Sequence, residues 1–404
     1  MSIRRRRKTH SVHIVRIADR CFSEEEIRQR LKEIARCHVS LRSVFIGGGT
    51  PRPLQVILKQ TELSCFFVDL RSLASREESL SGAQENYLRR LISLHRQQPP
   101  DGSKEVPFRM GLVRVAEKKT AVFLYLSHLM LDAAGITQVI EQLLGCRPIE
   151  PDAAAFGRFL YRLCRENRIP AQEYWKKTMG GTVGFTPLPS GTGSEAFVHD
   201  EAVSDSELLR KIGAVCARRS VTVSAVLHLA VGEALMDLLG LQEVCFASTT
   251  SGRDAASAHL AGMFINHFPI VVRRGDTPES LQAKILDGMR FGYPDANELP
   301  CEWSLPGLAG KLKLNVENAG EMAEGDLLPV LMRGDWNFAA AEAAATQPPR
   351  GIDGELTLMV FMRTQFRLDC FYSPASVDRA FVKRFSARLL TKLRQMAEQS
   401  SDSL

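Results

Sequence analysis

The sequence has no pair of cysteines in a CxxC arrangement, although nine cysteines are scattered over its 404 residues. Zinc sites commonly take closely spaced cysteines, and disulfide frameworks belong to small secreted chains, so neither is expected. Scattered cysteines are typical of reduced thiols that pack as small hydrophobic side chains. The sequence therefore predicts a cytoplasmic protein without a metal site.

Long apolar runs are also missing. No run approaches the roughly 20 residues that a membrane-spanning helix needs, so no membrane contact is expected. The basic residues 4–8 (RRRRK) are not followed by the apolar core of a secretory signal. They have no interleaved aromatic residues and the formal net charge is only +6, so no nucleic-acid binding is expected. They predict a solvated tail, with long-range attraction of an acidic partner protein as the alternative.

A phosphate-binding loop is absent as well. The glycines of residues 47–49 are followed by Pro51 and Pro53 rather than by Lys-Ser or Lys-Thr, so they predict a hairpin connection. The composition is otherwise that of an ordinary globular protein, with 45% hydrophobic and 24% charged residues. A chain of this length can form two lobes with a core each.

Residues 127–135 (SHLMLDAAG) are the most informative stretch. Before them, residues 120–126 (TAVFLYL) are apolar and rich in β-branched and aromatic side chains, which predicts a buried strand. After them, apolar residues recur at helical spacing over residues 136–144. His128 is therefore expected where a strand ends, and Asp132 just before a helix.

An imidazole at the end of a strand can take a proton from a nucleophile, because its pKa lies near working pH. This makes His128 a candidate general base. Asp132 is expected to bind a cation or backbone N–H groups and so to fix the loop that aims His128. Taken alone, the pattern H-x-x-x-D is found more often at a hydrogen-bonded core histidine than at a catalytic one.

Hydrophobic periodicity predicts strands and helices along the rest of the chain. The expected strands are residues 10–18, 53–58, 107–115, 244–249, 312–316, 356–362 and 366–371. The expected helices include residues 84–97, 152–167, 224–239 and 376–396, and two more that begin with capping boxes at Ser23–Glu26 and Ser204–Glu207. The alanine-rich residues 339–347 have no periodic apolar face and predict a loop.

The pattern His128-x-x-x-Asp132, entered from an apolar strand, resembles the active-site motif of the chloramphenicol acetyltransferase-like superfamily of CoA-dependent acyltransferases. Within it, the pattern is most similar to HHxxxDG of the condensation domains of nonribosomal peptide synthetases. Ser127 stands where that motif has its first histidine, and Ala133 where it has glycine. The resemblance implies that His128 is the catalytic histidine and that Ser127 and Gly135 support the active site. A hydrogen bond from Ser127 to a developing oxyanion is one interpretation, and a simple strand-end residue is the other.

Residues 35–45 are similar to the ARHPALRTRF opening of condensation domains, where His38 and Arg42 are expected to brace a turn. Residues 251–253 and 262–270 are similar to the SGR and GFFVNTLPLR motifs. The resemblance implies that Arg253 forms an ion pair with Asp132, joining the active-site loop to the other lobe.

Several polar residues of the second half have weaker assignments. The resemblance makes Asn266 and Ser251 candidates for lining a substrate channel. His267 replaces the usual threonine and is expected to be a partly exposed loop residue, while His228 is expected in the core.

The resemblance covers nearly the whole chain and implies an α+β fold, an α/β sandwich. Two chloramphenicol acetyltransferase-like lobes would form a V-shaped pseudodimer with a central channel. Residues 180–193, rich in glycine, threonine, serine and proline, predict a linker, so the expected lobes are 1–178, carrying the motif, and 179–404. We expect a free-standing monomer with no adenylation or carrier domain.

The resemblance implies a condensation-type acyltransferase of nonribosomal peptide or related natural-product biosynthesis. An acyl or aminoacyl group, held as a phosphopantetheine thioester on an acyl or peptidyl carrier protein, would pass to a small amine or alcohol acceptor. No bound cofactor is implied. Two alternatives remain: an acyltransferase that uses coenzyme A directly, and a non-catalytic module that recruits carrier proteins.

Overall fold

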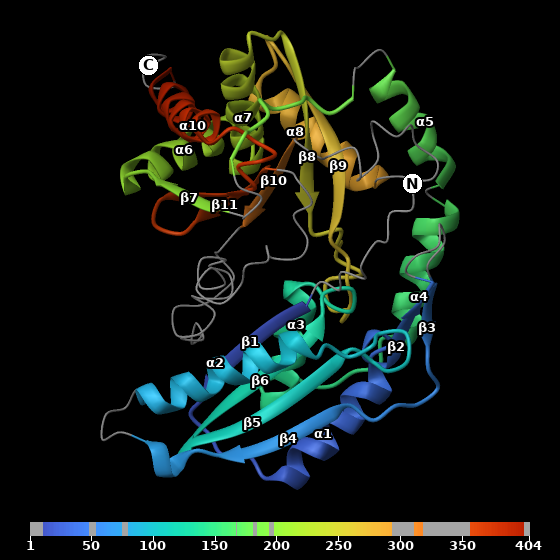
Figure 1. Ribbon diagram of the computed structural model, residues 1–404. Coiled ribbons are helices and arrows are strands. Elements are labelled where there is room, and N and C mark those ends of the chain that lie inside the picture. Colours follow the sequence, from blue (N-terminus) through green and yellow to red (C-terminus); the bar gives the residue numbers. More distant parts are fainter. Residues whose placement is uncertain are drawn as a thin grey trace. The chain divides into compact units, whose positions relative to one another are not determined.

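The computed structural model describes residues 11–47, 54–74, 80–166, 168–180, 184–193, 198–292, 311–317 and 356–399 (Figure 1). Residues 4–8 and 339–347, for which a tail and a loop are expected, lie outside them. The chain divides into two compact units. The first contains the described residues up to Leu163 together with Arg253–Phe264, and the second contains Cys164–Gly252 and the described residues from Ile265 on. We call Arg253–Phe264 the return segment, because it comes from the second half of the sequence but packs in the first unit.

The first unit is built on a four-stranded sheet in the order β1-β6-β5-β4. Its strands are β1 (Ser11–Ala18), β4 (Ser64–Asp69), β5 (Phe108–Ala116) and β6 (Lys119–Ser127). All neighbours are antiparallel except β4 and β5, which are parallel. The predicted strands at residues 10–18, 107–115 and 120–126 are thus confirmed.

Strand β6 is buried at every position after Lys119, because helices cover both faces of its sheet. On one face, α2 (Gly82–Gln97) packs through Leu88 against Phe123 and Tyr125. On the other, α1 (Glu24–Cys37) and α3 (Ala133–Leu144) pack against the alternate residues of β6. This unit also contains the ribbon of β2 (Ser43–Ile46) and β3 (Leu54–Ile57) and the helix α4 (Ala153–Tyr161). A π-helical turn, Arg162–Glu166, follows α4 and crosses the boundary between the two units. This sandwich fixes the end of β6, where the motif begins.

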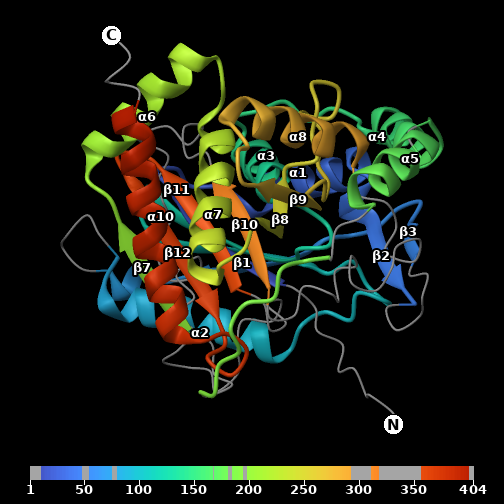
Figure 2. The same ribbon diagram turned by 90° about the horizontal axis from the view of Figure 1, so that it is seen from above.

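The second unit contains a six-stranded sheet in the order β7-β12-β11-β10-β8-β9. Its strands are β7 (Val198–Val203), β8 (Glu243–Thr250), β9 (Asn266–Arg273), β10 (Leu312–Glu317), β11 (Leu356–Met362) and β12 (Phe366–Tyr372). Its main helices are α5 (Arg168–Met179), α6 (Ser206–Arg219), α7 (Val223–Leu239), α8 (Pro278–Phe291) and α10 (Arg379–Gln399). Seen from above, α7, α8 and α10 lie over this sheet (Figure 2). They bury its alternate residues in the larger core of the chain.

The predicted lobes 1–178 and 179–404 stay a prediction, and the compact units differ from them in two respects. The units divide between Leu163 and Cys164, because Ala171, Trp175 and Met179 of α5 pack in the core of the second unit. In addition, the return segment belongs to the first unit. The V-shaped arrangement and the central channel also stay predictions.

No single helix in the described part of the chain has the length and apolar character to cross a membrane. Only the bent pair α6 and α7, at 110° to each other, passes that test by length and composition.

Candidate active site

His128 follows the last residue of β6, where the chain turns out of the sheet. The buried Ser127 makes this turn: its carbonyl accepts from the N–H of Met130 at 3.0 Å, and its Oγ accepts from the N–H of Leu129 at 3.4 Å. These bonds support the interpretation of Ser127 as a strand-end residue. The half-buried His128 is thereby placed on a short, fixed loop ahead of α3.

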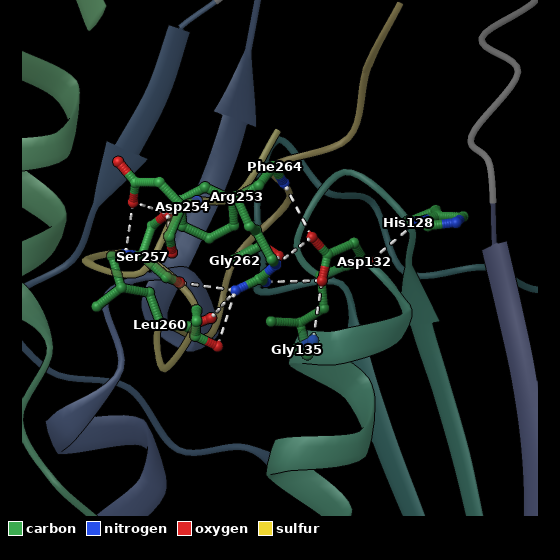
Figure 3. Close-up of polar contacts among 11 residues, drawn as sticks. His128, Asp132, Gly135, Arg253, Asp254, Ser257, Leu260, Gly262 and Phe264 are labelled. Carbon is green, nitrogen blue, oxygen red and sulfur yellow. Dashed lines mark hydrogen bonds and ion pairs between the residues drawn. The ribbon is translucent and has the colours of Figure 1, made fainter. Parts of the chain in front are cut away.

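The orientation of the His128 ring is set by one hydrogen bond. Its Nδ1 lies 2.9 Å from the carbonyl oxygen of Leu131 (Figure 3). Because a carbonyl can only accept, Nδ1 must carry the hydrogen. In the neutral ring the lone pair is therefore on Nε2, for which the described residues offer no hydrogen-bond partner.

The peptide group between Leu131 and Asp132 is also held through its N–H. The N–H of Asp132, which shares a planar peptide bond with the Leu131 carbonyl, donates to the carbonyl of Gly262 at 3.0 Å. A tilt of this plane would lengthen both hydrogen bonds. The orientation of His128 is thus coupled through one rigid peptide to Gly262 in the return segment.

Asp132 is the N-cap of α3, in an extended conformation with φ −84° and ψ 179°. Its Oδ1 accepts from the N–H of Gly135 at 2.8 Å, and its Oδ2 accepts from the N–H of Phe264 at 3.2 Å. The side chain is 2–3% exposed, so its charge needs a partner inside the protein.

That partner is Arg253, as the sequence resemblance implied, although the pair lies within the first compact unit and does not join two units. Its Nη2 lies 2.7 Å from Oδ1 of Asp132 and its Nε 3.0 Å from Oδ2, a bidentate pair. Nη1 donates to the carbonyls of Ser257 at 2.9 Å and Leu260 at 2.8 Å, and Nη2 also donates to Gly262 at 3.2 Å. All five guanidinium hydrogens are therefore used, and the carboxylate receives four hydrogen bonds. Asp132 is thus a structural anion without a free lone pair for proton transfer.

Gly135 lets the start of α3 approach the return segment closely. A Cβ atom on Gly135 would lie 3.2 Å from both the backbone nitrogen and the oxygen of Gly262. One on Gly262 would lie 2.5 Å from the ring of Phe264, which in turn carries the Arg253 guanidinium at 4.3 Å from its centroid. Two glycines therefore permit the contact that aligns Asp132 with Arg253.

The return segment is also braced from within. The carboxylate of Asp254 accepts from Ser257 Oγ at 2.6 Å and pairs with Arg162 at 2.6 Å. Leu260 and Phe264 pack with Val39 and Phe156 in a small core cluster. The carbonyl groups around Arg253 therefore belong to a loop with its own support.

Asn266 and Ser251 belong to the second unit, and their predicted role as channel-lining residues stays a prediction. Asn266 begins β9, where its Oδ1 accepts from the N–H of His267 at 2.8 Å. Ser251 is exposed and directly follows β8.

His267 is partly exposed, as predicted, but the prediction that it lies in a loop was wrong. It lies in β9, opposite Thr249 of β8, whose Oγ1 is 3.0 Å from Nδ1 of the ring. Burial, with a smaller contribution from the charge of Lys313, lowers the pKa of His267 to about 4. The prediction for His228 is confirmed: the ring is buried, and its nitrogens lie 2.7 Å from the Ser224 carbonyl and 2.8 Å from Ser248 Oγ.

Sequence patterns did not reveal the backbone groups of the site. The carbonyls of Leu131, Ser257, Leu260 and Gly262 and the N–H of Phe264 complete it, and every residue type supplies such groups. The one available sequence signal was Gly262, the first residue of the stretch that is similar to GFFVNTLPLR. Within the described ranges, no three or more histidine, cysteine, aspartate or glutamate residues are grouped to hold a metal ion.

Comparison with solved structures identifies the fold. The chain is similar to the structure reported for condensation domain-mediated chain release from the enacyloxin polyketide synthase, with a TM-score of 0.69 and 16% identity over 98% of this chain and 79% of that chain. It is also similar to the SgcC5 protein from Streptomyces globisporus, with a TM-score of 0.66 and 15% identity over 96% of this chain and 93% of that chain. The predicted α+β, chloramphenicol acetyltransferase-like fold is confirmed.

Sequence comparison identifies the family. A plipastatin synthase of Bacillus subtilis (strain 168) is 25% identical over 259 residues, which are 60% of this chain. The match spans only 7% of that much longer protein. The family model of the condensation domain matches residues 5–286, well over half of the chain. The chain therefore belongs to the condensation-domain family, as its motifs predicted.

Proposed function

We propose that this chain is a condensation-type acyltransferase with His128 as its general base. The observation that supports this most is the hydrogen bond from Nδ1 to the Leu131 carbonyl, which leaves the Nε2 lone pair for a proton. Nε2 would take the proton of an amine or alcohol as its nitrogen or oxygen bonds to a thioester carbonyl carbon. The C–S bond then breaks, and the departing thiolate takes the proton from Nε2, which returns His128 to its neutral form. General-base help of this kind contributes about 10²–10⁴-fold in rate.

In this proposal the Asp132–Arg253 pair positions the histidine and exchanges no proton. It fixes the start of α3 and the Leu131–Asp132 peptide, to which the ring is bonded. A rigid anchor matters because a misplacement of about 1 Å can cost about 10²-fold in rate.

We further propose that the acyl donor is a phosphopantetheine thioester on an acyl or peptidyl carrier protein. The support is family membership together with relatives that are named synthases, although the chain spans only 7% of the length of the plipastatin synthase. We also propose that the chain acts as a monomer. For the acceptor, the SgcC5 structure is reported with an aromatic 1,2-diol, so the test includes alcohols as well as amines.

The experiment compares the wild type with His128→Gln, using acyl-loaded carrier proteins and mixed amine and alcohol acceptors, read by intact-protein mass spectrometry. We expect the variant to lose about 10²–10⁴-fold in transfer rate. His259→Gln, which changes an exposed histidine of the same unit, is the matched control and should transfer at the wild-type rate. Undiminished transfer by His128→Gln would remove this residue from the mechanism.

The same assay separates the alternatives. A carrier thioester and the matching acyl-coenzyme A are offered side by side, and faster turnover of the latter would identify a coenzyme A-dependent enzyme. A wild-type chain that binds carriers but transfers nothing would be a recruitment module.

A further inference from the structure

His38 is a fully buried histidine outside the active-site motif, at the end of α1. Both of its ring nitrogens have partners within the first unit. Nδ1 lies 2.8 Å from Oδ2 of Asp152, and Nε2 lies 2.9 Å from Oε1 of Gln142. The turn that it was expected to brace is therefore held from two directions.

The partners fix the protonation of the ring. The Nε2 amide of Gln142 donates to the carbonyl of Pro148 at 3.1 Å, which requires an N–H and so places the amide oxygen toward His38. An amide oxygen and an ionised carboxylate can only accept. Nε2 of His38 must therefore carry a hydrogen, and with Asp152 ionised Nδ1 carries one as well, which makes the ring an imidazolium facing a carboxylate.

From this geometry we infer that His38 is a buried imidazolium, and that its pair with Asp152 positions the two elements that bring Asp132 and Arg253 together. The positioning role rests on the proposed acyl transfer, whereas the charge of the ring does not.

The contact between His38 and Gln142 connects the ring to α3. Gln142 lies in the last turn of this helix, whose first residue follows Asp132. Arg30 of α1 holds the same turn, with Nη1 3.2 Å from the carbonyl of Gln142. A helix of 12 residues is a rod of about 18 Å, so a shift at its last turn moves its N-cap as well.

The contact between His38 and Asp152 connects the ring to residues that pack against the return segment. Oδ1 of Asp152 accepts from the N–H of Val39 at 3.1 Å, and the N–H of Asp152 donates to the carbonyl of Cys37 at 3.0 Å. Val39 packs with Phe156 of α4 and with Leu260 and Phe264 of the return segment. His38 and Asp152 are thus connected through their contacts both to α3, which begins next to Asp132, and to residues that pack against the return segment, which carries Arg253.

The charge state is tested by NMR on the full-length protein labelled with ¹⁵N histidine. At about pH 7 we expect the His38 ring to show protonated-type shifts at both nitrogens. The assignment comes from the signal that disappears in His38→Asn or, if that variant does not fold, moves in Gln142→Met. A ring with one protonated nitrogen would overturn the inference.

The positioning role is tested with two variants of Gln142. Gln142→Met removes the acceptor for Nε2–H, and we expect kcat for acyl transfer to fall about tenfold with an unchanged KM for the acceptor. Gln142→Glu keeps an acceptor at this position and should retain kcat within about twofold. The control is His228→Gln, which disturbs a buried, doubly hydrogen-bonded histidine of the second unit. It should lower Tm and leave kcat unchanged.

Wild-type kcat in Gln142→Met, with a loss of Tm like that of His228→Gln, would overturn the positioning role. Absence of transfer by the wild type with every donor would instead count against the proposed function, and the NMR result would stand independently.

Discussion

Arg253 uses its planar fork in a way that lysine cannot copy. Its five N–H groups reach the Asp132 carboxylate and three carbonyls, whereas a lysine has three donors on a single atom. Arg253→Lys leaves buried acceptors without donors, each costing about 1–3 kcal/mol. We expect its free energy of unfolding, measured with urea, to fall by about 3 kcal/mol and acyl transfer to fall with it.

The matched control is Arg219→Lys. Arg219 also pairs with a carboxylate through two nitrogens, that of Glu279, but both side chains are more than 40% exposed. Exposed ion pairs contribute about 1 kcal/mol or less, so this change should leave the free energy of unfolding almost unchanged. Equal losses in the two variants would show that burial and fork geometry do not decide the stability of the Asp132–Arg253 pair.

His228 makes stability depend on pH. Burial lowers its pKa from 6.5 to about 4, since the charged ring is disfavoured inside the core. Between these values the unfolded chain binds a proton that the folded chain does not, so stability is full above about pH 6.5 and falls as the pH drops toward 4. From about pH 7 to about pH 5 this residue contributes a loss of about 2 kcal/mol.

In His228→Gln that part of the pH dependence should disappear. Urea unfolding at the two pH values measures it, and the stability gap between wild type and variant should narrow at the lower pH. A gap that stays constant would mean that His228 does not titrate in this range.

Two glycines within helices of the second unit differ in what surrounds them. A Cβ on Gly232 of α7 would lie 2.4 Å from a methyl carbon of Val272 in β9, whereas a Cβ on Gly213 of α6 would meet nothing within 4 Å. Gly232→Ala should therefore destabilise by about 1–3 kcal/mol. Gly213→Ala should stabilise by about 0.5–1 kcal/mol through helix propensity. Thermal unfolding of both variants checks the pair, and stabilisation by Gly232→Ala would contradict the close packing of α7 on β9.

Regular elements could be predicted because their signals are local. The strands β5 and β6 and the helix α3 follow the apolar pattern of the chain. Helix ends were less secure. Ser23 caps α1, but the Glu26 carboxylate pairs with Arg20 at 2.8 Å. The cap of α6 is Asp205 rather than the predicted Ser204, because the Oγ of Ser204 accepts from the N–H of Phe366 in β12.

Only those parts of the site could be predicted that consist of side chains in recognisable sequence motifs. His128, Asp132 and Arg253 were found through motifs, and the structure brings the latter two into contact. The predicted loop position of His267 was wrong because pairing with Thr249 of β8, a tertiary contact, places the residue in a strand. The double hydrogen bonding of His38 depends on Asp152, which is 114 residues away.

The return segment ties the two halves of the sequence into one structure. Residues 1–178 alone would lack it, leaving Asp132 buried without its cation, a loss of about 3–5 kcal/mol. We expect this fragment to show no cooperative melting by circular dichroism. Mixing it with residues 179–404 should restore a transition. A fragment that melts cooperatively at the Tm of the full chain would show that the return segment is dispensable.

The separation of 121 residues between Asp132 and Arg253 also means that the two residues are synthesised at different times. A ribosome adds about 5–20 residues per second, so the aspartate is added to the chain roughly 6–24 s before its arginine. For that interval the nascent first unit carries an unneutralised anion at the mouth of a helix. The pair between Asp132 and Arg253 can form only after translation has passed well into the second unit, so the first unit cannot complete its fold before then.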